Sequence, residues 1–220
     1  MPEHPTSDDQ PPVIITSTNR FGHDQADPDE TLADPMELLA AWLPGNDDEL
    51  RPLMTLTTIG ADGYPDSRSV LLSEFDGEAI AFHTDARTRK ARELAADGRV
   101  SLVLAWVEHA RQLTVAGDAV PVTAEAAASV FRARSRYLQL LAWMNSAELA
   151  HLPRAERVAA WEAFAAAHPE GTLDAPEHWV GYRVLPHRLT FWRGDLEGPS
   201  NRVEYTRGAD GAWSATRLPG

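Results

Sequence analysis

The chain contains the sequence Asp66-Ser-Arg68-Ser-Val-Leu-Leu-Ser73, followed by Phe82-His83-Thr84 and then Arg87-Thr-Arg89-Lys90-Ala-Arg92. Two apolar segments therefore precede a group of cations. Four of the 20 lysine and arginine residues, including the only lysine, fall within positions 87–92 of a chain with formal net charge −13. Arginine binds phosphate oxygens in a bidentate manner and lysine adds a compact charge, so this stretch predicts a site for a phosphate-bearing ligand. The alternative is that these cations form the solvated first turn of a surface helix.

Composition limits the classes of protein that this chain can represent. Its 220 residues, 43% hydrophobic and 24% charged, are typical of a globular protein with one substantial core. We expect no membrane span, because no run approaches 18 apolar residues, and no secretory signal, so we expect a cytoplasmic location. The absence of cysteine excludes disulfides and thiolate chemistry. A pI of about 5.0 disfavours nucleic acid as a partner.

The first segment differs in composition from the rest of the chain. Residues 1–34 carry eight acidic groups against one arginine, which predicts a disordered acidic tail over residues 1–33. A single α+β domain is expected over residues 34–220. Its first helix should begin with Asp34 as the cap and Pro35 at the first helical position, and should end at Pro44-Gly45.

Within this domain, runs of β-branched residues alternate with turn residues. The predicted strands cover 53–59, 67–73, 79–84, 99–106, 112–120, 179–185, 188–192, 202–207 and 212–217. Helices are predicted over 87–96 and within 123–167. The turns at Gly60–Gly63 and Asp76-Gly77 connect strands too closely for parallel crossovers, so we expect an antiparallel, barrel-like meander with peripheral helices.

Familiar catalytic templates do not fit this sequence. It has no Gly-x-Ser-x-Gly elbow, no phosphate-binding glycine loop, and no histidine spacing that indicates a metal site, so no metal is expected. A lone His83 at a strand end is more often structural than catalytic. The tryptophans are expected mainly in the core.

Several motifs in order resemble one known family. These are Arg68-Ser-Val-Leu-Leu-Ser73, Phe82-His-Thr84, Thr88-Arg-Lys90-Ala-Arg-Glu-Leu94, Arg111-Gln112 and Phe191-Trp192. Together with His178-Trp179-Val-Gly181-Tyr182 and Arg217-Leu218-Pro219, they resemble the pyridoxine/pyridoxamine 5′-phosphate oxidase family from about Asp34 to Pro219. Each motif alone is weak, whereas their common order and spacing is specific.

The resemblance implies an FMN-binding split β-barrel that forms a homodimer with FMN at the interface. It implies that Arg89 and Lys90 hold the FMN phosphate with Thr84, that Gln112 contacts the polar edge of the flavin, and that Trp192 and Arg202 come from the partner chain. The full set of implied cofactor residues is Arg68, Val70, Leu71, His83, Thr84, Arg89, Lys90, Gln112, Asn145, Ser146, Trp192 and Arg202.

The substrate side departs from the family pattern. Ser73 stands where the family has a lysine, and Gly198 and Ser200 stand where it has an arginine and a histidine. Val130 and Leu138 replace a tyrosine and a serine, whereas Arg134 matches a family arginine. Each lost charge-assisted hydrogen bond is worth about 1.5–3 kcal/mol, so these changes disfavour a dianionic vitamin phosphate. The phenazine-biosynthesis branch also has a serine at the position of Ser73, although its members generally keep the arginine and histidine.

The predicted function is therefore an FMN-dependent oxidase or dehydrogenase that takes hydride from a reduced small-molecule metabolite to flavin N5, with oxygen as acceptor. Phenazine-like secondary metabolism is the expected setting. The alternatives are a pyridoxine/pyridoxamine 5′-phosphate oxidase and a flavin-binding accessory protein without its own turnover. No general base is identified, and Arg134, His83 and Ser73 are the candidate substrate contacts.

Overall fold

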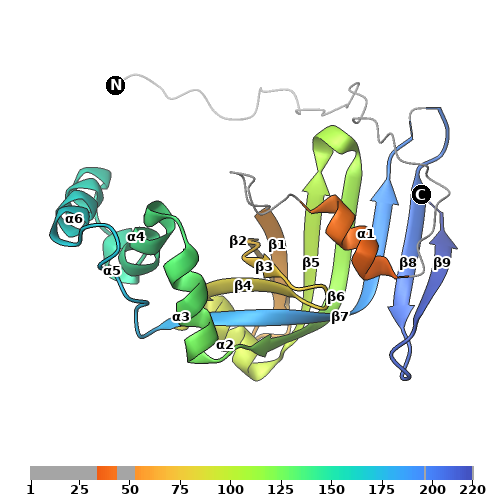
Figure 1. Ribbon diagram of the computed structural model, residues 1–220, viewed down its shortest axis with the longest axis horizontal. Helices are drawn as coiled ribbons and strands as arrows, with labels where there is room; N and C mark the ends of the chain where they lie inside the picture. Colours follow the sequence, from red (N-terminus) through yellow and green to blue (C-terminus); the bar gives the residue numbers. More distant parts are fainter. Residues whose placement is uncertain (1–33, 44–52, 196, 220) are drawn as a thin grey trace, which may run out of the picture.

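Nine antiparallel strands form one curled sheet in the computed structural model, which describes residues 34–43, 53–195 and 197–219 (Figure 1). The strand order is β2-β1-β5-β6-β7-β4-β3, and the β8–β9 hairpin is added along β7. The strands are β1 (Leu53–Ile59), β2 (Pro65–Leu71), β3 (Glu74–Phe75), β4 (Ile80–Asp85), β5 (Arg99–Trp106), β6 (Arg111–Pro121), β7 (Trp179–Arg193), β8 (Asn201–Arg207) and β9 (Trp213–Leu218).

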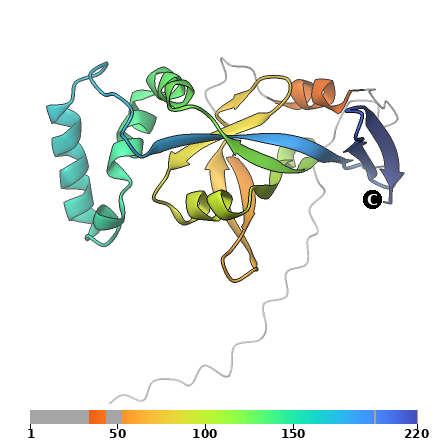
Figure 2. The ribbon, with the colours of Figure 1, turned by 90° about the horizontal axis from the view of Figure 1, so that it is seen from below.

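Helices lie around this sheet rather than between its strands. They are α1 (Pro35–Trp42), α2 (Arg89–Ala96), α3 (Ala124–Ala133), α4 (Arg136–Met144), α5 (Ala147–Ala150) and α6 (Arg154–Ala167). Helices α3 to α6 gather at one end of the molecule and the β8–β9 hairpin lies at the other, with β7 running between them (Figures 1 and 2). The predicted α+β split barrel with peripheral helices is confirmed. None of the helices in the described ranges is long and apolar enough to cross a bilayer.

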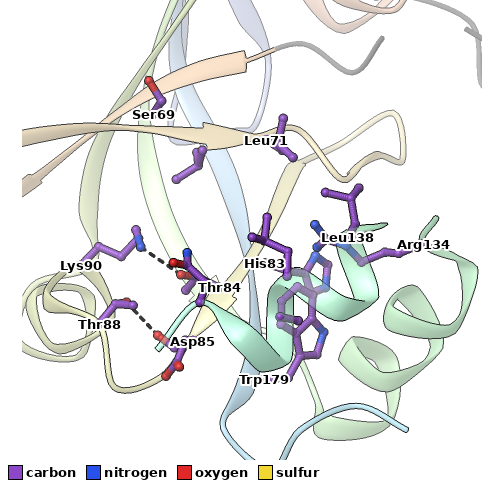
Figure 3. Close-up of a pocket in the computed structure, with 14 residues that line it drawn as sticks. Ser69, Leu71, His83, Thr84, Asp85, Thr88, Lys90, Arg134, Leu138 and Trp179 are labelled. Atoms are coloured by element: carbon purple, nitrogen blue, oxygen red, sulfur yellow. Dashed lines mark hydrogen bonds between the residues drawn. The ribbon is translucent and has the colours of Figure 1, made fainter. Parts of the chain in front are cut away.

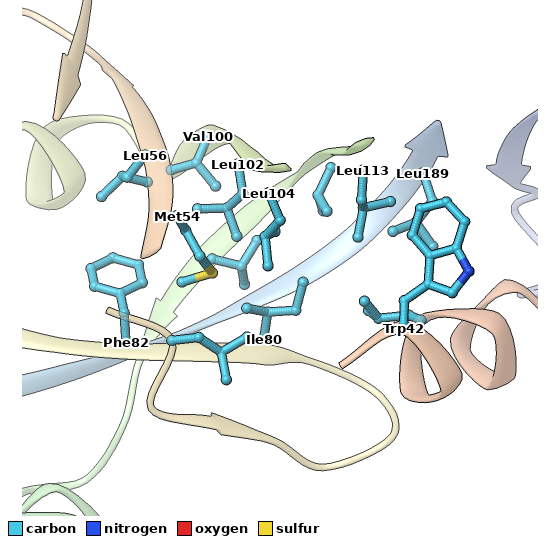
Figure 4. Packing of buried hydrophobic residues seen from close by; sticks show 14 of the residues in the cluster. Trp42, Met54, Leu56, Ile80, Phe82, Val100, Leu102, Leu104, Leu113 and Leu189 are labelled. Atoms are coloured by element: carbon cyan, nitrogen blue, oxygen red, sulfur yellow. The ribbon is translucent and has the colours of Figure 1, made fainter. Parts of the chain in front are cut away.

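The main core fills the inside of the curled sheet. Alternate residues of β1 and β5 point inward, and Met54, Leu56 and Leu102 are fully buried among them (Figure 4). Helix α1 closes one end with Trp42, whose ring meets that of Phe191 edge-on at 5.0 Å. Burial of these side chains is the dominant stabilising contribution.

The first helix begins as the sequence predicts. Asp34 Oδ1 accepts a hydrogen bond of 2.8 Å from the Met36 amide, and Pro35 occupies the first helical position. Helix α1 ends at Trp42 with Leu43 as its C-cap. The predicted end at Pro44-Gly45 and the predicted tail over residues 1–33 lie outside the described residues.

Two features of the sheet differ from the prediction. Strand β7 is continuous across Pro186, where two strands were expected. Proline lacks an amide donor, and the register of β6 against β7 shifts at Ala116/Gly117, directly opposite Pro186, which accommodates it. The simple meander was also wrong, because β4 pairs with β7 and β5 pairs with β1. The short strand β3 was not predicted.

The register shift explains a requirement for glycine at position 117. A Cβ atom there would overlap the backbone carbonyl oxygen of Leu185 and lie 3.1 Å from Pro186 Cα. Because backbone atoms cannot move aside cheaply, Gly117→Ala should destabilise the protein by about 2–3 kcal/mol in urea unfolding. Gly208→Ala is the control, since its nearest neighbour is the flexible Asp210 carboxylate at 2.7 Å. Equal stability of the two variants would contradict this explanation of the glycine at the register shift.

Candidate functional site

A pocket of about 220 Å³ opens between strands β2 and β4, the start of β7 and helices α2 and α4 (Figure 3). Both polar and apolar side chains line it. The lining residues are Ser69, Val70, Leu71, His83, Thr84, Asp85, Thr88, Lys90, Arg134, Leu138, Leu141, Ala142, Asn145 and Trp179. The pocket therefore brings predicted cofactor residues together with two predicted substrate residues, Arg134 and Leu138. The cofactor residues in its lining are Val70, Leu71, His83, Thr84, Lys90 and Asn145.

Lys90 provides the positive charge at one end of the pocket. It lies in the first turn of α2, and its Nζ donates a hydrogen bond of 3.0 Å to Oγ1 of the buried Thr84. It forms no ion pair with a carboxylate of the described residues. Burial lowers the pKa of Lys90, and the charge of Arg68 lowers this pKa further. A cation beside a hydroxyl, at the start of a helix, is suited to an anionic group such as a phosphate.

The neighbouring carboxylate, Asp85, has other partners. Arg87 Nη2 donates to Asp85 Oδ2 at 2.7 Å, and His178 Nε2 lies 3.3 Å from the same oxygen. Burial would raise the pKa of Asp85, but the hydrogen bonds from Arg87 outweigh it and hold the pKa below its usual range. The charge of Asp85 is thus largely balanced by residues outside the pocket.

Arg68 and Arg89 lie beside this end but do not line the pocket. They form an arginine–carboxylate cluster with Asp66 and Glu93. Arg68 Nη2 contacts Glu93 Oε2 at 2.7 Å and Asp66 Oδ2 at 2.9 Å. Arg89 Nε contacts Glu93 Oε1 at 2.8 Å and Asp66 Oδ2 at 3.0 Å. Their predicted contact with a phosphate stays a prediction.

Arg134 provides the positive charge at the other end of the pocket, across His83 and Trp179 from Lys90 (Figure 3). Its guanidinium carbon lies 4.7 Å from the centre of the Trp179 ring. Its Nε is buried without a hydrogen-bond partner among the described residues, and burial lowers the pKa of Arg134. Arg134 pairs with no carboxylate of the described residues. A partly buried, unpaired guanidinium costs free energy, which a bound anion would offset.

His83 is held in place by stacking rather than by hydrogen bonds. Its ring lies 5.5 Å from the Trp179 ring at an interplanar angle of 11°, and both ring nitrogens are buried without a partner among the described residues. A Cβ at Gly181, its partner across the β4–β7 ladder, would lie 2.5 Å from His83 Nε2, so glycine makes room for the ring. Burial, and then the charge of Arg134, lowers the pKa of His83 to about 4.

This lowered pKa predicts a dependence of stability on pH. Between pH 6.5 and 4 the unfolded chain binds a proton at His83 that the folded chain excludes, so stability rises with pH in this window and is lost on acidification. Allowing for partial solvent screening, we expect a loss of about 2 kcal/mol. Urea unfolding at several pH values should show that His83→Phe removes this part of the slope. The same slope in wild type and variant would contradict the neutral, buried His83.

A second set of predicted residues lies far from the pocket. Gln112, Trp192 and Arg202 form a row across β6, β7 and β8, because Trp192 pairs with Gln112 on one side and Arg202 on the other. Trp192 is 13 residues from Trp179 along β7, which corresponds to roughly 40 Å of extended strand. The row and the pocket of the same chain are therefore too far apart to form one site.

The remaining predicted residues also lie apart from the pocket lining. Gly198 and Ser200 are in the connection from β7 to β8, near the row rather than near Arg134. Ser146 caps α5, with the Leu149 amide donating to its Oγ at 3.3 Å. Ser73 follows β2 and donates its amide to the Ala81 carbonyl at 2.8 Å, and Val130 lies in α3. Their roles as cofactor or substrate contacts stay predictions.

Some lining residues were missed from the sequence. Trp179 was expected mainly in the core, and it does pack in a second hydrophobic cluster with Phe131 and Leu140, but its ring also faces the pocket. Asp85 and Thr88 lie next to residues that were singled out, so the local motif was a usable signal. Leu141 and Ala142 lie in the helical region 123–167, where sequence pattern does not indicate which residues reach a pocket.

The fold and the pocket define a split-barrel protein with a phosphate-compatible cation at one end of its site. At the other end is a guanidinium that has no carboxylate partner in the described part of the chain. Residues 48–171 match the family model described as pyridoxamine 5′-phosphate oxidase. Residues 179–219 match the pyridoxine 5′-phosphate oxidase C-terminal dimerisation region. The chain belongs to the pyridoxamine 5′-phosphate oxidase family.

Curated relatives agree with this assignment. The chain is 37% identical over 166 residues to a pyridoxine/pyridoxamine 5′-phosphate oxidase of Streptomyces avermitilis, covering 75% of this chain and 74% of the relative. It is 37% identical over 195 residues to the oxidase of that name from Thermosynechococcus vestitus, covering 86% and 90%. These relatives support an oxidoreductase, and the matched dimerisation region supports a homodimer.

Solved structures extend the likeness. PhzG from Burkholderia lata, solved in complex with tetrahydrophenazine-1-carboxylic acid, has a TM-score of 0.75 and 26% identity, covering 90% of this chain and 100% of that chain. An FMN-binding protein from Nostoc punctiforme, related to pyridoxamine 5′-phosphate oxidase, shares the fold with a TM-score of 0.64 and 19% identity, covering 77% and 88%. Family membership supports FMN as the cofactor.

The pocket itself fits part of such a cofactor. Lys90 and Thr84 offer a charged and a neutral donor for a phosphate. Val70 and Leu71 offer apolar contacts of the kind that a flavin ring system needs. The residues of the row, which the resemblance also assigns to FMN, are not within reach in the same chain.

Proposed function

We propose that the protein is an FMN-dependent oxidoreductase that oxidises a reduced, planar small molecule carrying a carboxylate. The observation that carries this proposal is Arg134, a partly buried guanidinium with no anionic partner in the described residues, at the end of the pocket opposite Lys90. Two separated cations suit two separate anions. One is the cofactor phosphate, and the other belongs to the substrate.

The side chains of this pocket have separate tasks in the proposal. Lys90 and Thr84 hold the phosphate, and Val70 and Leu71 contact the flavin. The separation along β7 supports a homodimer in which Gln112, Trp192 and Arg202 of the second copy complete the site. FMN when bound supplies the two-electron acceptor, taking a hydride from the substrate while a proton leaves to solvent. Oxygen is the proposed final acceptor.

Substrate selection is assigned to the Arg134 end. A carboxylate matches a planar guanidinium through two parallel hydrogen bonds and balances its single charge. Trp179 and Leu138 would face the apolar part of the substrate. Among the described lining residues at this end, Arg134 is the one lysine or arginine, and its single positive charge equals the single negative charge of a carboxylate. The ligand named for PhzG, a reduced tricyclic carboxylate, is an example of the class that we propose.

A second candidate function has its own support. The curated relatives at 31–37% identity that we compared are named pyridoxine/pyridoxamine 5′-phosphate oxidases, which favours the vitamin phosphate as substrate. The absence of lysine, arginine and histidine at Ser73, Gly198 and Ser200 weighs against it. The phenazine-like secondary metabolism and the cytoplasmic location expected from the sequence remain part of the proposal.

Anaerobic reduction of the bound flavin separates these functions. Purified protein loaded with FMN is mixed with tetrahydrophenazine-1-carboxylic acid or with pyridoxine 5′-phosphate, and flavin absorbance is followed. Rapid bleaching by the tricyclic carboxylate alone supports the proposal. Rapid bleaching by the vitamin phosphate overturns the proposed substrate class. Bound FMN that neither compound reduces favours the accessory role.

A further inference from the structure

Glu93 is the buried centre of the arginine–carboxylate cluster. Its side chain is 6% exposed and lies on the inner face of α2. Oε2 accepts hydrogen bonds from Thr58 at 2.6 Å and Arg68 at 2.7 Å, and Oε1 accepts one from Arg89 at 2.8 Å. One carboxylate therefore joins β1, β2 and α2, and α2 is the helix that carries Lys90 in its first turn.

We propose that Glu93 is a positioning residue for the phosphate end of the pocket, an inference that rests on the proposed FMN site there. The three hydrogen-bond partners of the Glu93 carboxylate named above do not line the pocket. It acts by fixing the first turn of α2 on the sheet, so that Lys90 stays beside Thr84, and by fixing the side chains of Arg68 and Arg89 next to that turn.

Charge gives a second reason for Glu93. The positive charge of Arg68 lies near enough to Lys90 to act against its protonation. Arg68 is only 19% exposed, so solvent screens it weakly, and Glu93 is its most buried counterion. With Glu93 neutral, the uncompensated charge of Arg68 would both disfavour charged Lys90 and leave a buried guanidinium with weaker hydrogen bonds.

Asp66 allows positioning to be separated from simple charge removal. It contacts the same two guanidinium groups, at 2.9 Å and 3.0 Å, but its side chain is 29% exposed and it lies on β2 rather than on α2. Asp66 and Glu93 neutralise the same two guanidinium groups, so charge removal alone predicts changes of the same sign in FMN binding for both variants. Positioning predicts weaker FMN binding for the Glu93 variant only.

The experiment compares FMN with riboflavin, which lacks the phosphate. Dissociation constants are measured by quenching of flavin fluorescence for wild type, Glu93→Gln, Asp66→Asn and Glu162→Gln, an exposed control on α6. We expect Glu93→Gln to weaken FMN binding at least tenfold and to change riboflavin binding less than twofold. Asp66→Asn should leave FMN binding equal or tighter, and Glu162→Gln should leave both ligands unchanged.

Several other outcomes would overturn the proposed role of Glu93. Equal changes for Glu93→Gln and Asp66→Asn, or tighter FMN binding by Glu93→Gln, overturn the positioning role. An equal loss of FMN and riboflavin shows that Glu93 supports only the fold. If Glu93→Gln does not fold, Glu93→Asp, which keeps the charge but shortens the side chain, should still weaken FMN at least threefold relative to riboflavin. Wild-type protein that binds riboflavin as tightly as FMN would instead remove the proposed phosphate site.

Discussion

Replacing Lys90 with methionine should weaken FMN binding by about 30- to 100-fold while leaving riboflavin binding within about threefold of wild type. Lys90 is the lysine or arginine that lines the phosphate-compatible end of the pocket, and it has no carboxylate partner among the described residues. A hydrogen bond to a charged group contributes about 1.5–3 kcal/mol, which corresponds to about 10- to 150-fold in affinity and so includes the expected loss. Methionine keeps the apolar stem, so the packing of α2 should survive.

Arg92→Met is the matched control for this measurement. Arg92 lies on the same helix and belongs to the same cation-rich stretch, but it is exposed and its Nη1 donates to the Arg87 carbonyl at 2.5 Å outside the pocket. We expect its FMN affinity to equal that of wild type. If Lys90→Met kept full FMN affinity, the phosphate would have to be held elsewhere, and Arg68 and Arg89 would be the first residues to test.

Arg134→Met should lower kcat/KM for a carboxylated substrate by about 100- to 1000-fold, because a bidentate ion pair would be lost. The same substitution should change kcat/KM less than fivefold for an analogue in which the carboxylate is replaced by a hydrogen. Stability should not fall and should even increase, because the substitution removes a partly buried charge that has no partner in the described residues. Opposite effects on activity and stability are typical of functional residues.

Two measurements test this account of Arg134. Steady-state kinetics with both substrates gives the dependence on the carboxylate, and thermal unfolding gives the stability. Arg132→Met, an exposed neighbour on α3, is the control and should leave kcat/KM within twofold of wild type. An equal loss of activity on the carboxylated and uncarboxylated substrates would contradict a carboxylate contact and indicate that Arg134 has a structural role.

Local chemistry in the sequence predicted the elements of the fold well. The cap at Asp34, the β1–β2 hairpin and the helix after residue 87 follow from turn and capping residues that act over a few positions. The pairing of the strands was harder to predict from the sequence. Pairing of β4 with β7 joins segments about 100 positions apart, and continuity across Pro186 depends on the bulge at Gly117 in another strand.

In the candidate site, too, local motifs were predictable from the sequence and long-range contacts were not. Lys90, Thr84 and Arg134 were identified from motifs, and the structure brings them to one pocket. The partners of Arg68 were not accessible to this reasoning, because Glu93 meets it only after α2 folds against the sheet. Trp179 was assigned to the core because burial is the usual fate of tryptophan, and a single ring that serves both core and pocket cannot be recognised from sequence spacing.

The length of strand β7 predicts which sites would be damaged in a dimer of two different variant chains. Trp179 at its start belongs to the pocket of its own chain, whereas Trp192 near its end lies in the row that the proposed dimer gives to the second copy. Each chain would then serve two cofactors. A mixed dimer of one chain damaged at Lys90 and one damaged at Trp192 would hold one doubly damaged site and one intact site, so two inactive proteins would complement each other.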